Sequence, residues 1–152
     1  MSALSPASVE FTGELAVALP IDGAFELFSP LGEKLWVPGW DPELLHPPGA
    51  SWERGLIFRT REEKGDAVWI VTDLDHAAHR VEYHRVEAGR YLARVRVQCA
   101  RAAERQTRVT VSYAFVGLSP DGNAEIARMT PGDYVDKMQR WERWIGEHRR
   151  YT

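Results

Sequence analysis

A long amphipathic segment near the C-terminus, residues 131–149, constrains the fold most. Thr130, Pro131 and Asp133 form a helix start signal: a capping hydroxyl, a first-turn proline and an acidic side chain in the first turn. Apolar side chains then recur at spacings of four, three and four, which is typical of one narrow helix face. They are Tyr134, Met138, Trp141 and Ile145. Because so aromatic a face needs a concave partner, we expect the preceding chain to form a sheet.

Size and composition favour one globular domain over residues 1–152, large enough to enclose a cavity. The net charge of -3 argues against a module that binds nucleic acid, since such domains are usually basic. A single cysteine, Cys99, excludes an internal disulfide. No stretch resembles a signal peptide or reaches the roughly eighteen apolar residues of a membrane span, so we expect a cytoplasmic protein.

Alternating apolar and polar residues predict an opening strand over 9–19. Two short helices follow, over about 20–28 and 29–35, and then an ordered loop rich in proline and glycine over 36–42. Five further strands are expected at 56–61, 67–73, 80–86, 91–100 and 107–116, joined by short turns. A short helical stretch beginning at Gly122 precedes the long C-terminal helix.

The apolar faces of neighbouring antiparallel strands must coincide, and this condition suggests a register. Placing Thr60 opposite Trp69 and Val71 opposite Tyr83 gathers the apolar residues on one face. Arg85 then lies inside, opposite Trp69. An unpaired charge in an apolar core would cost several kcal/mol, so this site must be wet, paired or functional.

A second register stays open. A two-residue turn at Ala88-Gly89 would direct His84 and Glu82 inward in place of Arg85. Either register places a polar side chain on the concave face.

The order of elements resembles the helix-grip fold of the START-like (SRPBCC) superfamily, which includes polyketide cyclases and pollen-allergen relatives. The resemblance covers nearly the whole chain and is most specific at 35–42, Leu-Trp-Val-Pro-Gly-Trp-Asp-Pro, and 118–124, Leu-Ser-Pro-Asp-Gly-Asn-Ala, which look like a bacterial branch of the superfamily. It implies an α+β fold in which a curved antiparallel sheet of six to seven strands wraps the long C-terminal helix, with two short helices after strand one. It also implies a hydrophobic cavity between sheet and helix. It implies no reaction, because one fold serves many functions.

Large aromatic side chains and one arginine are the candidate ligand contacts. Each aromatic residue could equally be ordinary core, and Trp36 and Trp40 could either form a lid over the cavity or anchor their loop. The candidates are Trp36, Trp40, Phe58, Trp69, Tyr83, Arg85, Tyr113, Tyr134, Met138 and Trp141.

We expect no metal site and no cofactor. His76 and His79 fall in a predicted turn, and the sequence places no third or fourth ligand at a suitable spacing. No phosphate-binding glycine loop or nucleophile elbow is present in the sequence.

The favoured function is binding of a small hydrophobic or aromatic molecule in this cavity, anionic ligands included, with Arg85 orienting a carboxylate, enolate or phenolate. The alternative is a cyclase or dehydratase in which Arg85 stabilises an enolate while Tyr83 or His84 transfers a proton. A third hypothesis is an interaction protein that forms a homodimer through its convex face or lid loop. The sequence leaves the choice between binding and catalysis open.

Overall fold

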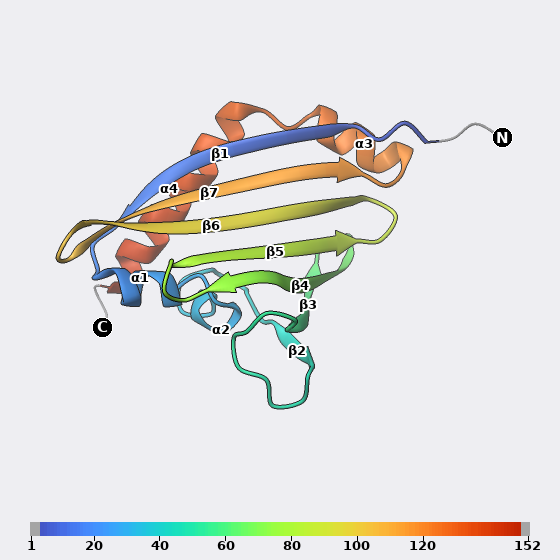
Figure 1. The fold of residues 1–152 in the computed structure, drawn as a ribbon. Coiled ribbons are helices and arrows are strands. Elements are labelled where there is room, and N and C mark those ends of the chain that lie inside the picture. The colour runs from blue at the N-terminus through green and yellow to red at the C-terminus, as the bar shows by residue number, and fades with distance from the viewer. Residues whose placement is uncertain (1–3, 150–152) are drawn as a thin grey trace.

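A curved antiparallel sheet wraps a long helix in the computed structural model, which describes residues 4–149 (Figure 1). The ends of the predicted domain, residues 1–3 and 150–152, lie outside the described residues. In chain order the elements are β1 (Ser8–Val17), α1 (Ile21–Glu26), α2 (Pro30–Glu33), β2 (Glu43–His46), β3 (Ile57–Glu62), β4 (Gly65–Asp75), β5 (Arg80–Glu87), β6 (Tyr91–Ala103), β7 (Gln106–Gly117), α3 (Pro120–Ala127) and α4 (Pro131–Arg149).

The seven strands lie in the order β1-β7-β6-β5-β4-β3-β2, and every neighbouring pair is antiparallel. β2 to β7 form a meander, and β1 closes the sheet by pairing with β7. The red helix α4 crosses the sheet on one face, beside β1 and β7 (Figure 1). The predicted helix-grip architecture is therefore confirmed. No helix within residues 4–149 is long and apolar enough to cross a membrane.

Side-chain caps start α2 and α4 where the sequence predicts them, whereas α3 begins at Pro120, two residues before the predicted start at Gly122. The Ser29 hydroxyl accepts a hydrogen bond from the Gly32 N–H at 2.9 Å and opens α2. The Thr130 hydroxyl accepts one from the Asp133 N–H at 3.1 Å, and α4 begins at Pro131. Each hydroxyl satisfies a backbone donor that has no partner inside the helix, which fixes the starting residue.

The aromatic face of α4 is buried against the sheet, as predicted. The exposed fractions are 7% for Tyr134, 3% for Met138, 9% for Trp141 and 2% for Ile145. Gly13 in β1 permits this close approach, because a Cβ atom there would lie 2.9 Å from side-chain atoms of both Tyr134 and Met138. The sheet therefore supplies the concave partner that the helix requires.

The sequence does not predict β2. Its four residues, Glu43–His46, are all exposed and pair with β3 only. A short strand at a sheet edge, flanked by Pro42 and Pro47, has neither an apolar alternation nor a buried face to mark it.

The predicted pairing of Thr60 with Trp69 is wrong by two residues. Phe58 lies opposite Trp69, and Thr60 lies opposite Ala67. The turn is made by residues 63 and 64, one residue earlier than predicted, so the pairing moves by two. A shift of two residues preserves the side-chain alternation, and the predicted inner face is therefore still the inner face.

The register of the next pair is as predicted, and it decides between the two alternatives. Tyr83 lies opposite Val71, and Arg85 lies opposite Trp69. Because Glu87 pairs with Tyr91, three residues form the turn at 88–90. The two-residue turn that would direct His84 and Glu82 inward is therefore wrong.

Candidate functional site

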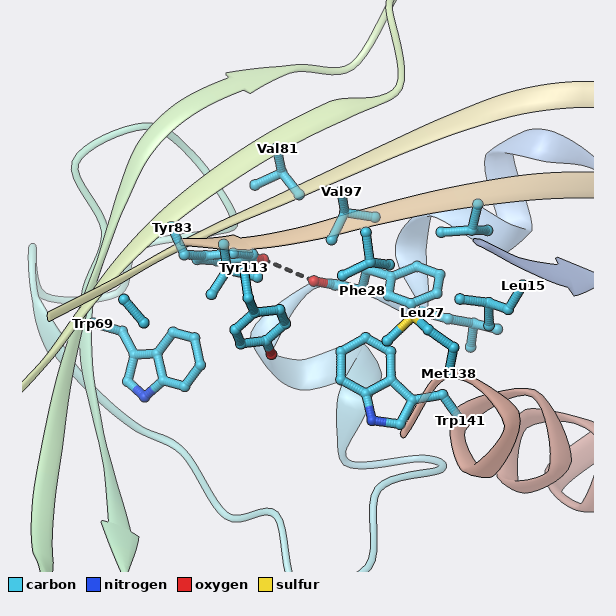
Figure 2. Packing of buried hydrophobic residues seen from close by; sticks show 14 of the residues in the cluster. Leu15, Leu27, Phe28, Trp69, Val81, Tyr83, Val97, Tyr113, Met138 and Trp141 are labelled. Atoms are coloured by element: carbon cyan, nitrogen blue, oxygen red, sulfur yellow. Dashed lines mark hydrogen bonds between the residues drawn. The ribbon is translucent and has the colours of Figure 1, made fainter. Parts of the chain in front are cut away.

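A cavity of about 930 Å³ lies between the concave face of the sheet, the loop over 37–43 and α4. Strands β3 to β7 supply one wall, and Trp141 of α4 supplies part of the other. In Figure 2, Tyr113 of the sheet lies between Trp69 and Trp141. The space falls within the usual range for small-molecule sites.

Seven of the ten predicted contacts line this cavity. They are Trp40, Phe58, Trp69, Tyr83, Arg85, Tyr113 and Trp141. The rings of Phe58 and Trp69 are stacked, with centres 5.5 Å apart, and Tyr83 meets both of them edge-on. These aromatic faces make a wall suited to a flat apolar ligand.

The other three, Trp36, Tyr134 and Met138, do not line the cavity and belong to the packed interior. The Trp36 indole donates to the Leu27 carbonyl at 2.7 Å, which anchors its loop. Tyr134 stacks on Phe11, with ring centres 5.4 Å apart, and its hydroxyl donates to a backbone carbonyl of β7. Met138 packs against β1. The close approach of β1 to α4 fills the space around the two helix residues, and a role of these three side chains in ligand binding stays a prediction.

Trp40 combines the two roles considered for its loop. Its indole N–H donates to the Pro30 carbonyl at 2.8 Å, so the loop is anchored to α2. Its ring also meets Trp69 edge-on, with centres 5.6 Å apart, and lines the cavity.

Arg85 lies in the cavity wall among aromatic rings. Its guanidinium carbon is 5.2 Å from the ring centre of Trp69 and 5.6 Å from that of Tyr91, distances at which a cation is attracted to a ring face. Its Nε is buried and has no hydrogen-bond partner among the described residues. A buried donor without a partner is uncommon and is satisfied when an acceptor binds beside it.

Of the three expectations for the Arg85 site, wet, paired or functional, the structure shows a partial pair. Its Nη2 lies 3.4 Å from a carboxylate oxygen of Glu87, which is also buried. Glu87 accepts a much shorter bond from Arg90, and Arg90 in turn pairs with Glu125. Because Glu87 is shared between two guanidinium groups, Arg85 is only partly neutralised and keeps donors for a ligand.

Tyr83 lines the cavity, but its hydroxyl is already occupied. It donates to the Phe28 carbonyl at 2.7 Å, the dashed bond in Figure 2, and accepts from the Trp52 indole at 3.0 Å. Burial raises the pKa of Tyr83 well above its usual value. A hydroxyl held in this way is a poor candidate for proton transfer.

The groups of the alternative register lie on the convex face. His84 Nδ1 is 2.9 Å from the Thr72 hydroxyl, and Glu82 pairs with Arg96 at 2.7 Å. Neither side chain lines the cavity. The proton-transfer role considered for His84 therefore has no geometric support.

Tyr113 differs from Tyr83, because its hydroxyl forms no hydrogen bond with another described residue. Burial raises the pKa of Tyr113, and the Arg85 charge opposes that shift. The Lys137 amine lies over this ring, with its Nζ 3.6 Å from the ring centre of Tyr113 and 5.3 Å from that of Trp141.

A carboxyl group, that of Glu33 in α2, also lines the cavity.

The sequence analysis missed Glu33 and Lys137. A signal existed for Lys137, which is three residues after Tyr134 and four before Trp141 and therefore lies beside the apolar face of the helix. No local pattern marks Glu33, which lines the cavity from the last position of α2.

Within residues 4–149 no cluster of three or more histidine, cysteine, aspartate or glutamate side chains could hold a metal ion. His79 Nε2 lies 2.7 Å from an Asp22 carboxylate oxygen, and both His76 and His79 meet the ring of Phe25 edge-on. The two imidazoles therefore contribute to packing around α1.

The sequence matches no family model and no curated protein. Solved structures do resemble the chain. They include norcoclaurine synthase from Thalictrum flavum in complex with dopamine and hydroxybenzaldehyde, at 14% identity and a TM-score of 0.66, with 95% of this chain and 90% of that chain covered. Ginseng major latex-like protein 151 from Panax ginseng is 16% identical, with a TM-score of 0.67 and coverage of 93% and 97%.

A third similar structure is BexL, a di-domain ARO/CYC protein from the BE-7585A biosynthetic pathway. It is 15% identical, with a TM-score of 0.69, and the match covers 91% of this chain and 46% of BexL. At these identities the likeness shows the fold alone. The chain therefore has the helix-grip fold of START-like proteins.

Proposed function

We propose that this protein binds a small, flat aromatic molecule that carries an acidic group, in the cavity between the sheet and α4. The aromatic wall of Phe58, Trp69 and Tyr113 would cover the faces of the ligand, and burial of apolar surface would supply most of the affinity.

The observation that carries this proposal is the Arg85 guanidinium, which lines the cavity, pairs only loosely with Glu87 and has a buried Nε without a hydrogen-bond partner. A carboxylate, enolate or phenolate oxygen beside the guanidinium would accept a hydrogen bond from it and balance the charge that Glu87 neutralises only in part. The Tyr113 hydroxyl, which forms no hydrogen bond within residues 4–149, could donate a second bond.

The similar structures support a small aromatic ligand. Norcoclaurine synthase has been solved with dopamine and hydroxybenzaldehyde, both single-ring aromatic molecules. The fold thus accommodates ligands of this size in at least one relative in structure. The cyclase alternative draws support from BexL, but it needs a proton-transfer group other than Tyr83 or His84.

Two matched fluorescent probes test the proposal. 8-Anilinonaphthalene-1-sulfonate is anionic, and N-phenyl-1-naphthylamine is the same ring system without the sulfonate. Arg85→Met should weaken binding of the anionic probe by about 1.5 to 3 kcal/mol, the scale of a hydrogen bond to a charged group, and should change binding of the neutral probe little.

Arg94→Met is the control, because Arg94 lies on the convex face and pairs loosely with Glu10. This variant should bind both probes as the wild type does. Equal binding of the anionic probe by the wild type and Arg85→Met would contradict the proposal.

A further inference from the structure

The Lys137 amine lies in unusual surroundings for a lysine. The chain has three lysines, and Lys34 and Lys64 pair with Asp41 and Glu125 at 3.6 and 3.1 Å. Lys137 forms no ion pair with a carboxylate among the described residues, and its amine rests on the rings of Tyr113 and Trp141 instead. Both rings line the cavity, so the amine lies in direct contact with two of its lining side chains.

Three charged groups act on this amine, from three elements. Burial lowers the pKa of Lys137 to about 7, and the charges of Arg85 in β5 and Arg140 in α4 act in the same direction. Glu33 of α2 opposes them. A large share of the amine is therefore neutral near pH 7, which is the form that acts as a nucleophile.

Glu33 shares the cavity and is shifted in the opposite direction. Burial raises the pKa of its carboxyl to about 8, and the Lys137 charge opposes the shift. The Glu33 side chain is half-buried, and its accessible part lines the cavity. A negative charge is poorly solvated there, which favours the protonated carboxyl. Near pH 7 the Lys137 amine is therefore partly neutral and the Glu33 carboxyl is mainly protonated, and the described residues show no ion pair between the two groups.

We propose that Lys137 is a reactive amine that forms an imine with an aromatic aldehyde or ketone bound in the cavity, and that Glu33 serves as the acid and base of that step. The proposal rests on the proposed function only for the location of the aromatic ring, and it does not require Arg85 to hold an anion.

The step balances without any further reactant. The amine lone pair forms a bond to the carbonyl carbon, the C=O π pair moves to oxygen, and that oxygen takes the proton of the Glu33 acid. The nitrogen then returns a proton to the Glu33 carboxylate. Glu33 next protonates the hydroxyl, which leaves as water while the nitrogen lone pair forms the C=N bond. Finally the nitrogen gives its remaining proton back to Glu33, which ends as it began.

Reductive trapping tests this. The full chain is incubated with 2-naphthaldehyde and sodium cyanoborohydride near pH 7, and the modified lysines are located and quantified by peptide mass spectrometry. We expect Lys137 to be modified about 100-fold faster than Lys34 or Lys64, because a large share of the buried Lys137 amine is neutral near pH 7. Since the comparison is made within one wild-type molecule, it does not depend on the folding of a variant.

Two variants test whether Glu33 acts as the acid and base of imine formation at Lys137. Glu33→Gln should slow trapping at Lys137 by about 100-fold, the range of general acid–base catalysis, while the trapping rates at Lys34 and Lys64 in the same molecule stay unchanged. Lys64→Met is the matched lysine control and should leave trapping at Lys137 unaffected. The trapping rate at Lys137 should also pass through a maximum between pH 7 and 8, because the amine loses its proton near pH 7 and the Glu33 acid loses its proton near pH 8, whereas the rates at the two surface lysines do not depend on that acid and should keep rising.

Modification of Lys137 no faster than of Lys34 and Lys64 would overturn the proposal. If Arg85→Met still weakened binding of the anionic probe, that result would leave the proposed binding function standing. Fast trapping at Lys137 together with unchanged binding of the anionic probe by Arg85→Met would instead contradict the role of Arg85 and support the reactive amine.

Discussion

Arg85 faces Trp69 across the β4–β5 pair, with its guanidinium carbon 5.2 Å from the centre of the indole ring. The same guanidinium reaches Glu87 at 3.4 Å along its own strand. Stacking and a shared carboxylate together make a largely buried cation tolerable on an inner sheet face, and they leave its Nε directed to no protein acceptor.

Arg85→Met should destabilise the fold by roughly 1 to 2 kcal/mol, because the buried Glu87 carboxylate keeps only Arg90 as a charged partner. Denaturant titration measures the change in the free energy of unfolding. Arg94→Met on the convex face should stay within about 0.5 kcal/mol of the wild type. An Arg85→Met variant more stable than the wild type would mean that the pair with Glu87 contributes nothing.

Trp141→Ala should lower the free energy of unfolding by about 3 kcal/mol, near the bottom of the range for a buried tryptophan. The ring packs on Trp36 and Tyr113, with centres 5.5 and 6.3 Å away, but its exposure to the cavity reduces the loss. Denaturant titration gives the value. A loss below about 1 kcal/mol would contradict the packing of α4 described above.

Two glycine substitutions should change stability in opposite directions. Gly13→Ala brings a Cβ to 2.9 Å from Tyr134 and Met138 and should destabilise by about 1 to 3 kcal/mol through overpacking. Gly146→Ala meets nothing within 4 Å on α4 and should stabilise by up to about 1 kcal/mol through helix propensity. Melting temperatures of the two variants provide the comparison, and a neutral Gly13→Ala would mean that the helix lies farther from β1.

Glu33 and Lys137 should give stability two opposing dependences on pH. The folded pKa of Glu33 is raised from 4.5 to about 8, so its contribution is present below 4.5 and is lost as the pH rises through 8. The folded pKa of Lys137 is lowered from 10.5 to about 7, so the unfolded chain binds more protons between these values and stability rises with pH there.

Each dependence is isolated by subtraction. The unfolding free energy of the wild type minus that of Glu33→Gln should fall between pH 4.5 and 8. The difference from Lys137→Met should rise from pH 7 upward, and subtraction removes the opposing effect of Cys99, whose pKa burial raises to about 12. Flat differences in both cases would contradict the buried position of the two groups.

Local signals made much of the fold predictable. The Thr130 cap and the aromatic face of α4 depend on residues close in sequence, and the inner face of the sheet follows from strict alternation. Turn position was less certain, because moving the turn to residues 63 and 64 changes the pairing of Trp69 without changing which face it occupies. Alternation alone left Arg85 and the pair of His84 and Glu82 as alternatives, because the length of the turn after β5 decides between them.

The site was predictable only in part. Tyr134 and Trp141 lie on one face of α4, yet only Trp141 lines the cavity. The close approach of β1 to α4 leaves no space beside Tyr134, and a sequence pattern does not contain that distance. Phe28 and Trp36, on either side of α2, pack on Trp141 of α4, and this brings Glu33 close enough for its charge to act on Lys137. No local pattern encodes that relation, because the two segments are about a hundred residues apart.

Indole N–H resonances in a two-dimensional NMR spectrum report where an aromatic ligand binds. On titration with 8-anilinonaphthalene-1-sulfonate, we expect the signals of Trp40, Trp69 and Trp141 to shift, since these three indoles line the cavity. Trp144, which does not line it, should be unaffected. Shifts confined to Trp144, or absent from Trp69 and Trp141 at saturating probe, would contradict binding between the sheet and α4.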